Sequence, residues 1–238
     1  MIPVIDHYLI YNGKSTQDWH AYVDGDGTFK APERDYEEVE IPGKDGSLLI
    51  DNKRYKNMVV SYNGFIVDDF DKNFMAMRDF LTHDFGYHRL EDTYHPDEYR
   101  MAAYAGPTEP DVYMLEAGKY TLSFLCKPQR WLKDGEKEIM ITGSGKIKNP
   151  TLFDAKPKII VTAGTGAIQI NDVTVTLSAN SGATVIDCDI QDCYEGLTNR
   201  NKDIVLNTGS FPVLSPGVNG IQLASGMTVK IVPRWFIL

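Results

Sequence analysis

The sequence predicts a mainly β fold with one helix, in which a β-rich α+β N-terminal domain precedes a β-sandwich. Two observations support this. Short apolar segments bounded by glycine turns recur along most of the 238 residues, as is typical of antiparallel strands. A single segment, near residues 70–82, instead repeats its apolar residues at helical spacing. After residue 157 only strand patterns occur, and six or more short strands in about a hundred residues favour a sandwich.

The first strands are predicted from alternation and from the turns between them. Asn12-Gly13 and the run Pro42 to Gly46 are strong turn formers, since glycine and asparagine accept positive φ and proline presets φ. The candidate strands that these turns separate are residues 7–11, 19–23, 35–41, 47–51 and 56–65.

The helix is predicted over residues 70–81. Phe70, Phe74, Met77 and Leu81 fall on one helical face, and either of two aspartates, 68 or 69, is placed to cap the start. Because only one face is apolar, we expect this helix to pack on the sheet around it.

The segments after the helix return to strand patterns. Residues 87–90 and 99–104 predict a hairpin across an acidic loop, and residues 117–126 alternate cleanly as a strand. Residues 127–135 contain a proline, a charged cluster and Asp134-Gly135, which are typical of a boundary. We therefore expect an N-terminal domain over 1–132 and a C-terminal domain over 137–238.

The segment from Gly143 to Pro150 contains Gly-Ser-Gly-Lys, which matches part of the sequence motif of a phosphate-binding loop. The full motif needs glycine at position 140 and Ser or Thr at 147, where Met140 and Ile147 stand. The sequence therefore predicts a basic loop between the domains.

A structured turn near the C-terminus is predicted from residues 211–221, FPVLSPGVNGI. The stretch holds two apolar anchors and then two turn-forming pairs: Phe211 and Leu214, then Pro216-Gly217 and Asn219-Gly220. An alternating run at 227–232 follows, so we expect a strand, a turn and a closing strand.

Composition argues against several classes of function. The formal net charge of −9 and the pI of about 5.0 disfavour a protein that clamps nucleic-acid phosphates. The three cysteines form no disulfide framework, and we expect reduced, partly buried thiols made in a cytoplasm. The first residues lack the basic and apolar segments of a signal peptide, and no apolar run is long enough for a membrane helix.

Motifs for catalysis or metal binding are weak, so we expect no enzyme, no cofactor and no metal site. Residues 24–28 are similar to a calcium loop but have Phe29 where glycine is required. The densest polar cluster contains His83, His88 and His95, for which a metal-dependent hydrolase is one hypothesis and a solvated hairpin loop the favoured one. Cys188 has no evident histidine partner.

Carbohydrate binding is the main alternative function. The three tryptophans, at 19, 131 and 235, could line a sugar site on a β-sandwich, although aromatic residues there are more often core or interface residues. Motif analysis by itself thus favours a structural or binding protein.

The segment Phe-Pro-x-Leu-x-Pro-Gly-x-Asn, followed by a strand and Pro233-Arg234-Trp235, resembles the C-terminal end of the distal tail (Dit) proteins of siphophages. Further similar stations occur in order along the chain: the Pro42 to Leu48 turn, the helix at 70–81, the strand 120–126 with Lys127-Pro128, the segment Asn149-Pro150-Thr151 with Pro157, and residues 187–196.

This resemblance implies a belt-like N-terminal domain that assembles into a hexameric ring and a galectin-like β-sandwich C-terminal domain. It also implies a non-enzymatic hub at the virion tail tip, synthesised in the host bacterial cytoplasm. The implied partners are the tail tube protein on one side, and tail-tip components (a tail-associated lysin or the tape-measure end) or receptor-binding proteins on the other. DNA would pass through the ring without specific binding, and an acidic lumen would repel it.

Overall fold

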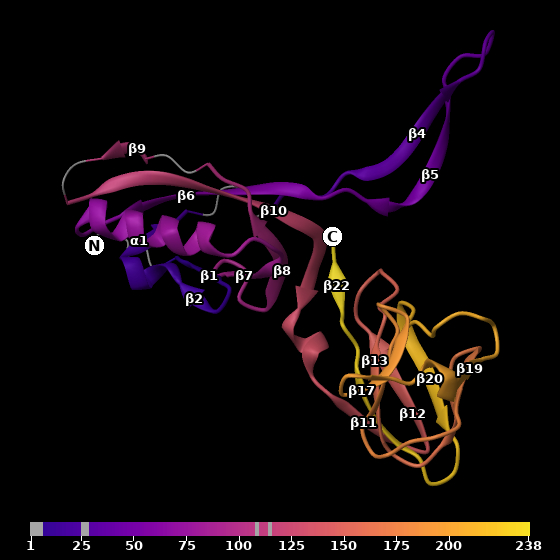
Figure 1. The fold of residues 1–238 in the computed structure, drawn as a ribbon. Helices are drawn as coiled ribbons and strands as arrows, with labels where there is room; N and C mark the ends of the chain where they lie inside the picture. Colours follow the sequence, from indigo (N-terminus) through magenta and orange to yellow (C-terminus); the bar gives the residue numbers. More distant parts are fainter. Residues whose placement is uncertain (1–6, 25–28, 108–109, 114–115) are drawn as a thin grey trace. The chain divides into compact units, whose positions relative to one another are not determined.

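The computed structural model describes residues 7–24, 29–107, 110–113 and 116–238. The chain divides into two compact units, one of residues 1–130 with residue 238, and one of residues 131–237. Both are built mainly of strands, and the described residues contain one α-helix (Figure 1). The predicted fold class, mainly β with one helix, is confirmed.

The first unit is organised around one large antiparallel sheet, with strand order β2-β1-β7-β8-β10-β6-β3 and with β9 paired to β10. A separate two-stranded sheet, β4-β5, belongs to the same unit. The bounds are β1 (Leu9–Tyr11), β2 (Lys14–Ser15), η1 (Thr16–Trp19), β3 (Ala21–Val23), β4 (Arg34–Glu40), β5 (Ser47–Tyr55), β6 (Met58–Ile66), α1 (Phe70–His83), β7 (His88–Asp92), β8 (Glu98–Tyr104), β9 (Pro110–Tyr113) and β10 (Gly118–Leu132).

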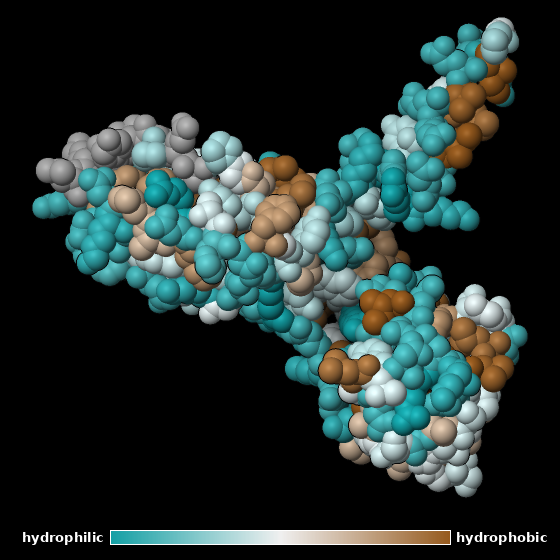
Figure 2. All heavy atoms as spheres, in the orientation of Figure 1, coloured by the Kyte–Doolittle hydropathy of each residue, from teal (hydrophilic) through white to brown (hydrophobic). Residues whose placement is uncertain are grey.

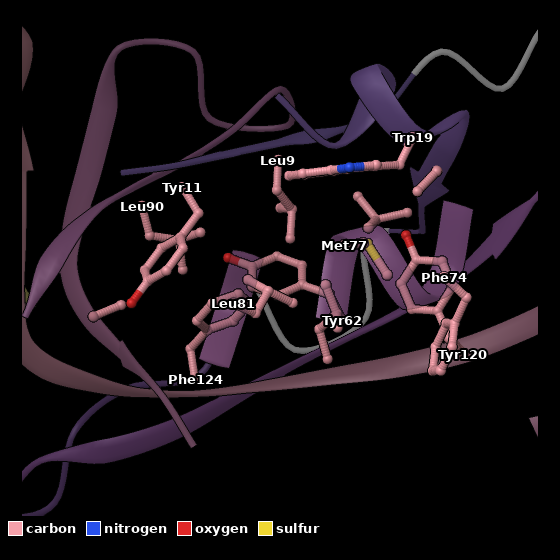
Figure 3. Packing of buried hydrophobic residues seen from close by; sticks show 14 of the residues in the cluster. Leu9, Tyr11, Trp19, Tyr62, Phe74, Met77, Leu81, Leu90, Tyr120 and Phe124 are labelled. Atoms are coloured by element: carbon pink, nitrogen blue, oxygen red, sulfur yellow. The ribbon is translucent and has the colours of Figure 1, made fainter. Parts of the chain in front are cut away.

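The helix α1 covers one face of the large sheet. Its buried residues are the four that the sequence predicted: Phe70, Phe74, Met77 and Leu81. Figure 3 shows the helix side chains facing aromatic residues of the sheet, among them Tyr62 of β6. This packing gives the first unit its hydrophobic core.

The start of α1 differs from the expected side-chain cap. Asp69 occupies the N-cap position with φ of 39°, but its side chain makes no capping hydrogen bond. The Asn73 side chain instead donates to the Asp68 carbonyl at 2.7 Å. The left-handed backbone at Asp69 is the feature that turns the chain into the helix.

The second unit is a sandwich of two antiparallel sheets, with strand orders β11-β21-β13-β16-β17-β18 and β12-β20-β14-β15-β19. The bounds are η2 (Lys133–Glu136), β11 (Ile139–Thr142), β12 (Ser144–Asn149), β13 (Lys158–Ala163), β14 (Gly166–Ile170), β15 (Val173–Leu177), β16 (Thr184–Asp187), β17 (Asp192–Glu195), β18 (Thr198–Asn199), η3 (Asn201–Asp203), β19 (Ile204–Leu206), β20 (Gly217–Leu223), β21 (Thr228–Val232) and β22 (Phe236–Ile237).

The inward positions of both sheets meet in one apolar core. Ile159 and Ile231 from the first sheet and Ile168 and Ile221 from the second are at most 1% exposed. Outward positions on the same strands are more exposed, which is the alternation expected for a sandwich.

The prediction that residues 143–150 form a basic loop is wrong. Residues 144–149 form strand β12, which pairs with β20 from Ser144 opposite Gln222 to Asn149 opposite Gly217. Ile147 points inward and is 3% exposed, while Lys146 and Lys148 point outward. With only one large apolar residue in six, this strand is formed because its partner strand supplies the pairing.

The C-terminal segment closes the second unit. Trp235 is 3% exposed in the core, and its carbonyl accepts a hydrogen bond from the Leu132 amide at 2.9 Å. Arg234 has φ of 61° and directs its guanidinium to Asp187 of β16, with two parallel hydrogen bonds of 2.6 and 2.7 Å. The chain end is therefore tied to the middle of the sandwich by an ion pair whose carboxylate is buried.

Candidate functional site

The turn predicted at Asn219-Gly220 is wrong, because both residues lie within strand β20 and pair with β12. The bend in this stretch is at Pro216, immediately before the strand. Leu214 is fully buried and pairs with Ala155 by two backbone hydrogen bonds, of 2.8 and 3.0 Å. Gly217 begins β20 with φ of 88°, a conformation that a residue with a side chain rarely adopts. Phe211 packs half-buried against the same core, and Pro216 precedes the glycine.

Asn219 lies within β20, opposite Ile147 of β12, and its side chain points inward. It is 1% exposed, and its side-chain oxygen accepts from the Ser215 amide at 2.8 Å and from the Asn171 side chain at 2.7 Å. Its side-chain nitrogen donates to the carbonyls of Ser215, Gly217 and Ile147 at 2.8, 3.1 and 3.4 Å. The residue thus ties Ser215 and the start of β20 to β12, and it presents no polar group to solvent.

We expect Asn219→Ala to lower the free energy of unfolding of the full chain by about 2 kcal/mol, because buried partners would lose their hydrogen bonds. Urea unfolding checks this. Gln222→Ala, an exposed position on the same strand, is the matched control and should change stability by no more than about 0.5 kcal/mol. A loss at Asn219 no larger than at Gln222 would contradict the role given to the amide.

The predicted histidine cluster does not converge on one point. The ring nitrogen Nε2 of His88 lies 3.3 Å from Asp84, and Nδ1 of His95 lies 3.2 Å from Asp92. His83 is exposed at the end of α1. Within the described ranges no three His, Cys, Asp or Glu side chains are grouped to hold a metal ion. The calcium-like segment at 24–28 lies, apart from Asp24, outside the described residues.

The three cysteines are free and buried. Burial raises the pKa of Cys126 and of Cys193 to about 11 and that of Cys188 to about 12. At neutral pH these groups are thiols, and the thiolate is the nucleophilic form. The geometry therefore gives none of them the character of a catalytic nucleophile.

Two of the three tryptophans proposed as a sugar-binding surface lie in the hydrophobic cores, and Trp131 is half-buried. Trp19 is 7% exposed in the first unit, and Trp235 is 3% exposed in the second. Trp131 packs against Phe236, with ring centroids 5.4 Å apart. Since a stacked sugar needs an open aromatic face, this set does not form the predicted site.

The hairpin β4-β5, here called the arm, is the most unusual exposed surface of the first unit (Figure 1). Its strands pair from Arg34 opposite Tyr55 to Glu40 opposite Ser47. All residues between Tyr36 and Arg54 are exposed. An isolated two-stranded hairpin is marginally stable in water, so a long exposed one is typical of a segment that packs on something else.

One face of the arm is mainly apolar, although it also carries Glu37 opposite Ile50, and the other face is mainly acidic. Val39 lies opposite Leu48, with Ile41 and Ile50 two residues away on the same face, and these side chains are 40–52% exposed. Figure 2 shows hydrophobic side chains gathered along one side of the arm. The other face carries Glu38 opposite Leu49, together with Glu40, Tyr36 and Asp51.

Ion pairs fix the base of the arm. Arg34 donates to Asp51 at 3.0 Å through Nε and to the Tyr55 hydroxyl at 2.7 Å, and Arg54 donates to Asp35 at 2.5 Å. Hydrogen bonds from the arginines lower the pKa of both aspartates. The base is thereby held in register without a hydrophobic core.

The strands of the arm are close to those predicted from the sequence, but its isolation was not foreseen. The available signal is that most apolar residues occupy one face and most carboxylates the other, in a pair of strands rich in charge. Such a pattern also fits a half-buried strand of a sheet, and only the tertiary structure distinguishes the two.

The described helices include none long and apolar enough to cross a membrane. No family model and no curated protein sequence matches the chain.

The chain thus combines a one-helix β domain, which bears an exposed hairpin, with a C-terminal β-sandwich. The chain is similar along its whole length to the crystal structure of the SPP1 Dit (gp 19.1) protein, which is described as a paradigm of the hub adsorption apparatus in phages that infect Gram-positive bacteria. The TM-score is 0.76 at 16% identity, with 98% of this chain and 99% of the other covered. The resemblance to Dit proteins is thus confirmed at the level of the fold.

Proposed function

We propose that this chain is a structural virion protein, a distal tail hub that assembles into a hexameric ring at the tail tip. The ring joins the tail tube protein on one side to the tail-tip or baseplate proteins on the other, which include a tail-associated lysin, the tape-measure end or receptor-binding proteins. DNA passes through its lumen without specific binding. The protein acts by assembly and is not an enzyme.

The uncovered apolar face of the arm is the observation that carries this proposal. A closed ring requires two different patches on each subunit, one that extends to the next copy and one that the preceding copy contacts. The arm fits the reaching patch, because Val39, Ile41, Leu48 and Ile50 gain by leaving water when a neighbouring copy covers them. Its acidic face stays in solvent and opposes unwanted pairing between free arms. The fold likeness to a protein described as a hub supports the same role.

The test compares Leu48→Glu with Leu49→Glu. Both leucines are exposed on β5, at 52% and 60%, but they point to opposite faces of the arm. We expect Leu48→Glu to weaken ring assembly at least about tenfold, since a charge cannot be buried unpaired at little cost, and Leu49→Glu to assemble like the unaltered chain.

Light scattering after size exclusion, over a concentration series, measures the assembly. Six copies of the 26.7 kDa chain form a species of about 160 kDa. Negative-stain images of that species should show six-fold rings. The proposal would be contradicted by equal effects of the two substitutions, or by an unaltered chain that stays monomeric and without rings at every concentration.

A further inference from the structure

The outer face of the β12-β20-β14-β15-β19 sheet differs in charge from the rest of this acidic protein. None of its outward-facing strand positions carries a carboxylate, whereas β12 presents Lys146 and Lys148. No salt bridge is found for either lysine among the described residues. Elsewhere in the same unit Lys156 pairs with Asp189 at 3.2 Å and Lys230 with Glu138 at 2.8 Å. Two adjacent ammonium groups on this face are therefore available to an anionic partner.

Gly220 leaves one outward position of this face without a side chain, and this position is here called the notch. It lies on β20 directly opposite Lys146 and is exposed. A Cβ atom at Gly220 would meet nothing within 4 Å, and its φ is not positive. In contrast, a Cβ at Gly64 or Gly145, which also lie within strands, would approach another atom to 2.3 or 2.9 Å. Packing within the chain therefore does not require glycine at position 220. A glycine within a strand often marks a place where a ligand approaches the backbone closely.

The side chains around the notch favour a hydroxyl-rich ligand over a protein. Asn171 borders Gly220 on the side away from the lysines, and its side-chain oxygen accepts from the Gly220 amide at 3.0 Å. Two residues along the sheet, Gln222 of β20 lies opposite Gln169 of β14, whose Nε2 donates to the Asn171 carbonyl at 2.8 Å. Val218 is the large apolar residue beside the notch, and no aromatic residue stands at an outward strand position of this sheet. The cores of protein interfaces are rich in aromatic residues and depleted of lysine. The composition of this sheet face is the opposite of that.

We propose that this face binds an anionic, hydroxyl-rich polymer, a glycan or polyol chain that carries phosphate or carboxylate groups. The chain lies across Gly220, its anionic groups face Lys146 and Lys148, and its hydroxyls exchange hydrogen bonds with Gln169 and Gln222. This site uses neither the arm nor the buried tryptophans, and its existence does not depend on ring formation.

The experiment measures binding of the full chain to three soluble probes by isothermal titration calorimetry at low salt. The probes are poly(glycerol phosphate), polygalacturonate and neutral dextran. We expect binding to at least one anionic polymer, and the comparison between the first two identifies phosphate or carboxylate as the preferred group. Dextran should bind at least about tenfold more weakly, because it offers nothing to the lysines.

Three variants test the location. Lys146→Glu with Lys148→Glu, and separately Gly220→Leu, should each reduce the affinity at least about tenfold, by charge reversal and by filling the notch. Lys156→Glu with Lys202→Glu makes the same charge change elsewhere in the unit and should stay within about twofold. Circular dichroism checks folding, and Lys146→Gln with Lys148→Gln serves if the reversed pair misfolds.

The proposal is overturned if neither anionic polymer binds, if dextran binds as well, or if the control pair weakens binding as much as the pair on β12. Light scattering on the same samples reports ring assembly separately. A variant that loses polymer binding but still assembles therefore tests only the proposed binding site. A variant that loses assembly but still binds polymer tests only the proposed hub function.

Discussion

Gly64→Ala is expected to destabilise the first unit by about 3 kcal/mol or more. The added Cβ would lie 2.3 Å from the Tyr22 carbonyl oxygen of β3 and 2.6 Å from the Tyr120 ring. Tyr120 is fully buried and donates to that same carbonyl at 3.0 Å, so neither neighbour can withdraw freely. Strand β3 would have to part from β6. Urea unfolding followed by circular dichroism measures the loss.

Gly220→Ala is the matched control for this substitution. It is also a glycine-to-alanine change within a strand, but its Cβ meets open space. There we expect a change of no more than about 0.5 kcal/mol, because the added methyl group meets no atom and alanine has less conformational freedom to lose on folding. If both variants unfold at the same urea concentration as the unaltered chain, the close packing of β3, β6 and β10 described above is wrong.

Asp187→Ala is expected to destabilise the second unit by about 3 kcal/mol. This is the lower end of the range for breaking a buried ion pair, since the Arg234 side chain keeps 25% of its surface exposed. The carboxylate is 5% exposed, and it also accepts from the Asp189 amide at 3.1 Å. Faster hydrogen exchange of the β16 and β21 amides should accompany the loss.

Asp189→Ala is the control, because Asp189 forms an exposed pair with Lys156 and should contribute less than about 1 kcal/mol. A loss at Asp187 no greater than at Asp189 would show that the C-terminal tie is not structural.

The Asp187 ion pair also predicts the direction of a pH dependence. Burial acts to raise the pKa of Asp187, but the hydrogen bonds and charge of Arg234 outweigh it and hold the pKa below its ordinary value. A carboxyl group with a lowered pKa in the folded state contributes its full stability above the unfolded pKa of about 3.9. That contribution is lost as the pH falls through the lower folded value. The difference in stability between the unaltered chain and Asp187→Ala should therefore shrink below about pH 4.

Several elements could be predicted from the sequence because their signal is local. The helix face of Phe70, Phe74, Met77 and Leu81 is a repeat that only an α-helix places on one side, and all four are buried. The strand from Tyr120 to Cys126 alternates in the same way, and its inward residues lie in the core. Periodicity over four or more residues carries this information without any knowledge of partners.

Other elements required the tertiary structure because their signal lies in a partner strand. The segment Ser144 to Asn149 was predicted to be a loop, because it has a single large apolar residue among serine, glycine, asparagine and two lysines. It is a strand because β20 completes its hydrogen bonds, and that pairing brings Lys146 beside Gly220. No sequence pattern brings together residues separated by about seventy positions.

The sequence by itself determined the β-rich class, the one helix and the resemblance to distal tail proteins, since each rests on periodicity or on ordered motifs. Only the tertiary structure decided that residues 34–55 form an exposed arm, that Trp19 and Trp235 are buried and that the three histidines do not meet. The physical reason is that burial is a property of the whole fold. An apolar strand face has the same sequence pattern whether the chain's own core covers it or it stays exposed for another molecule.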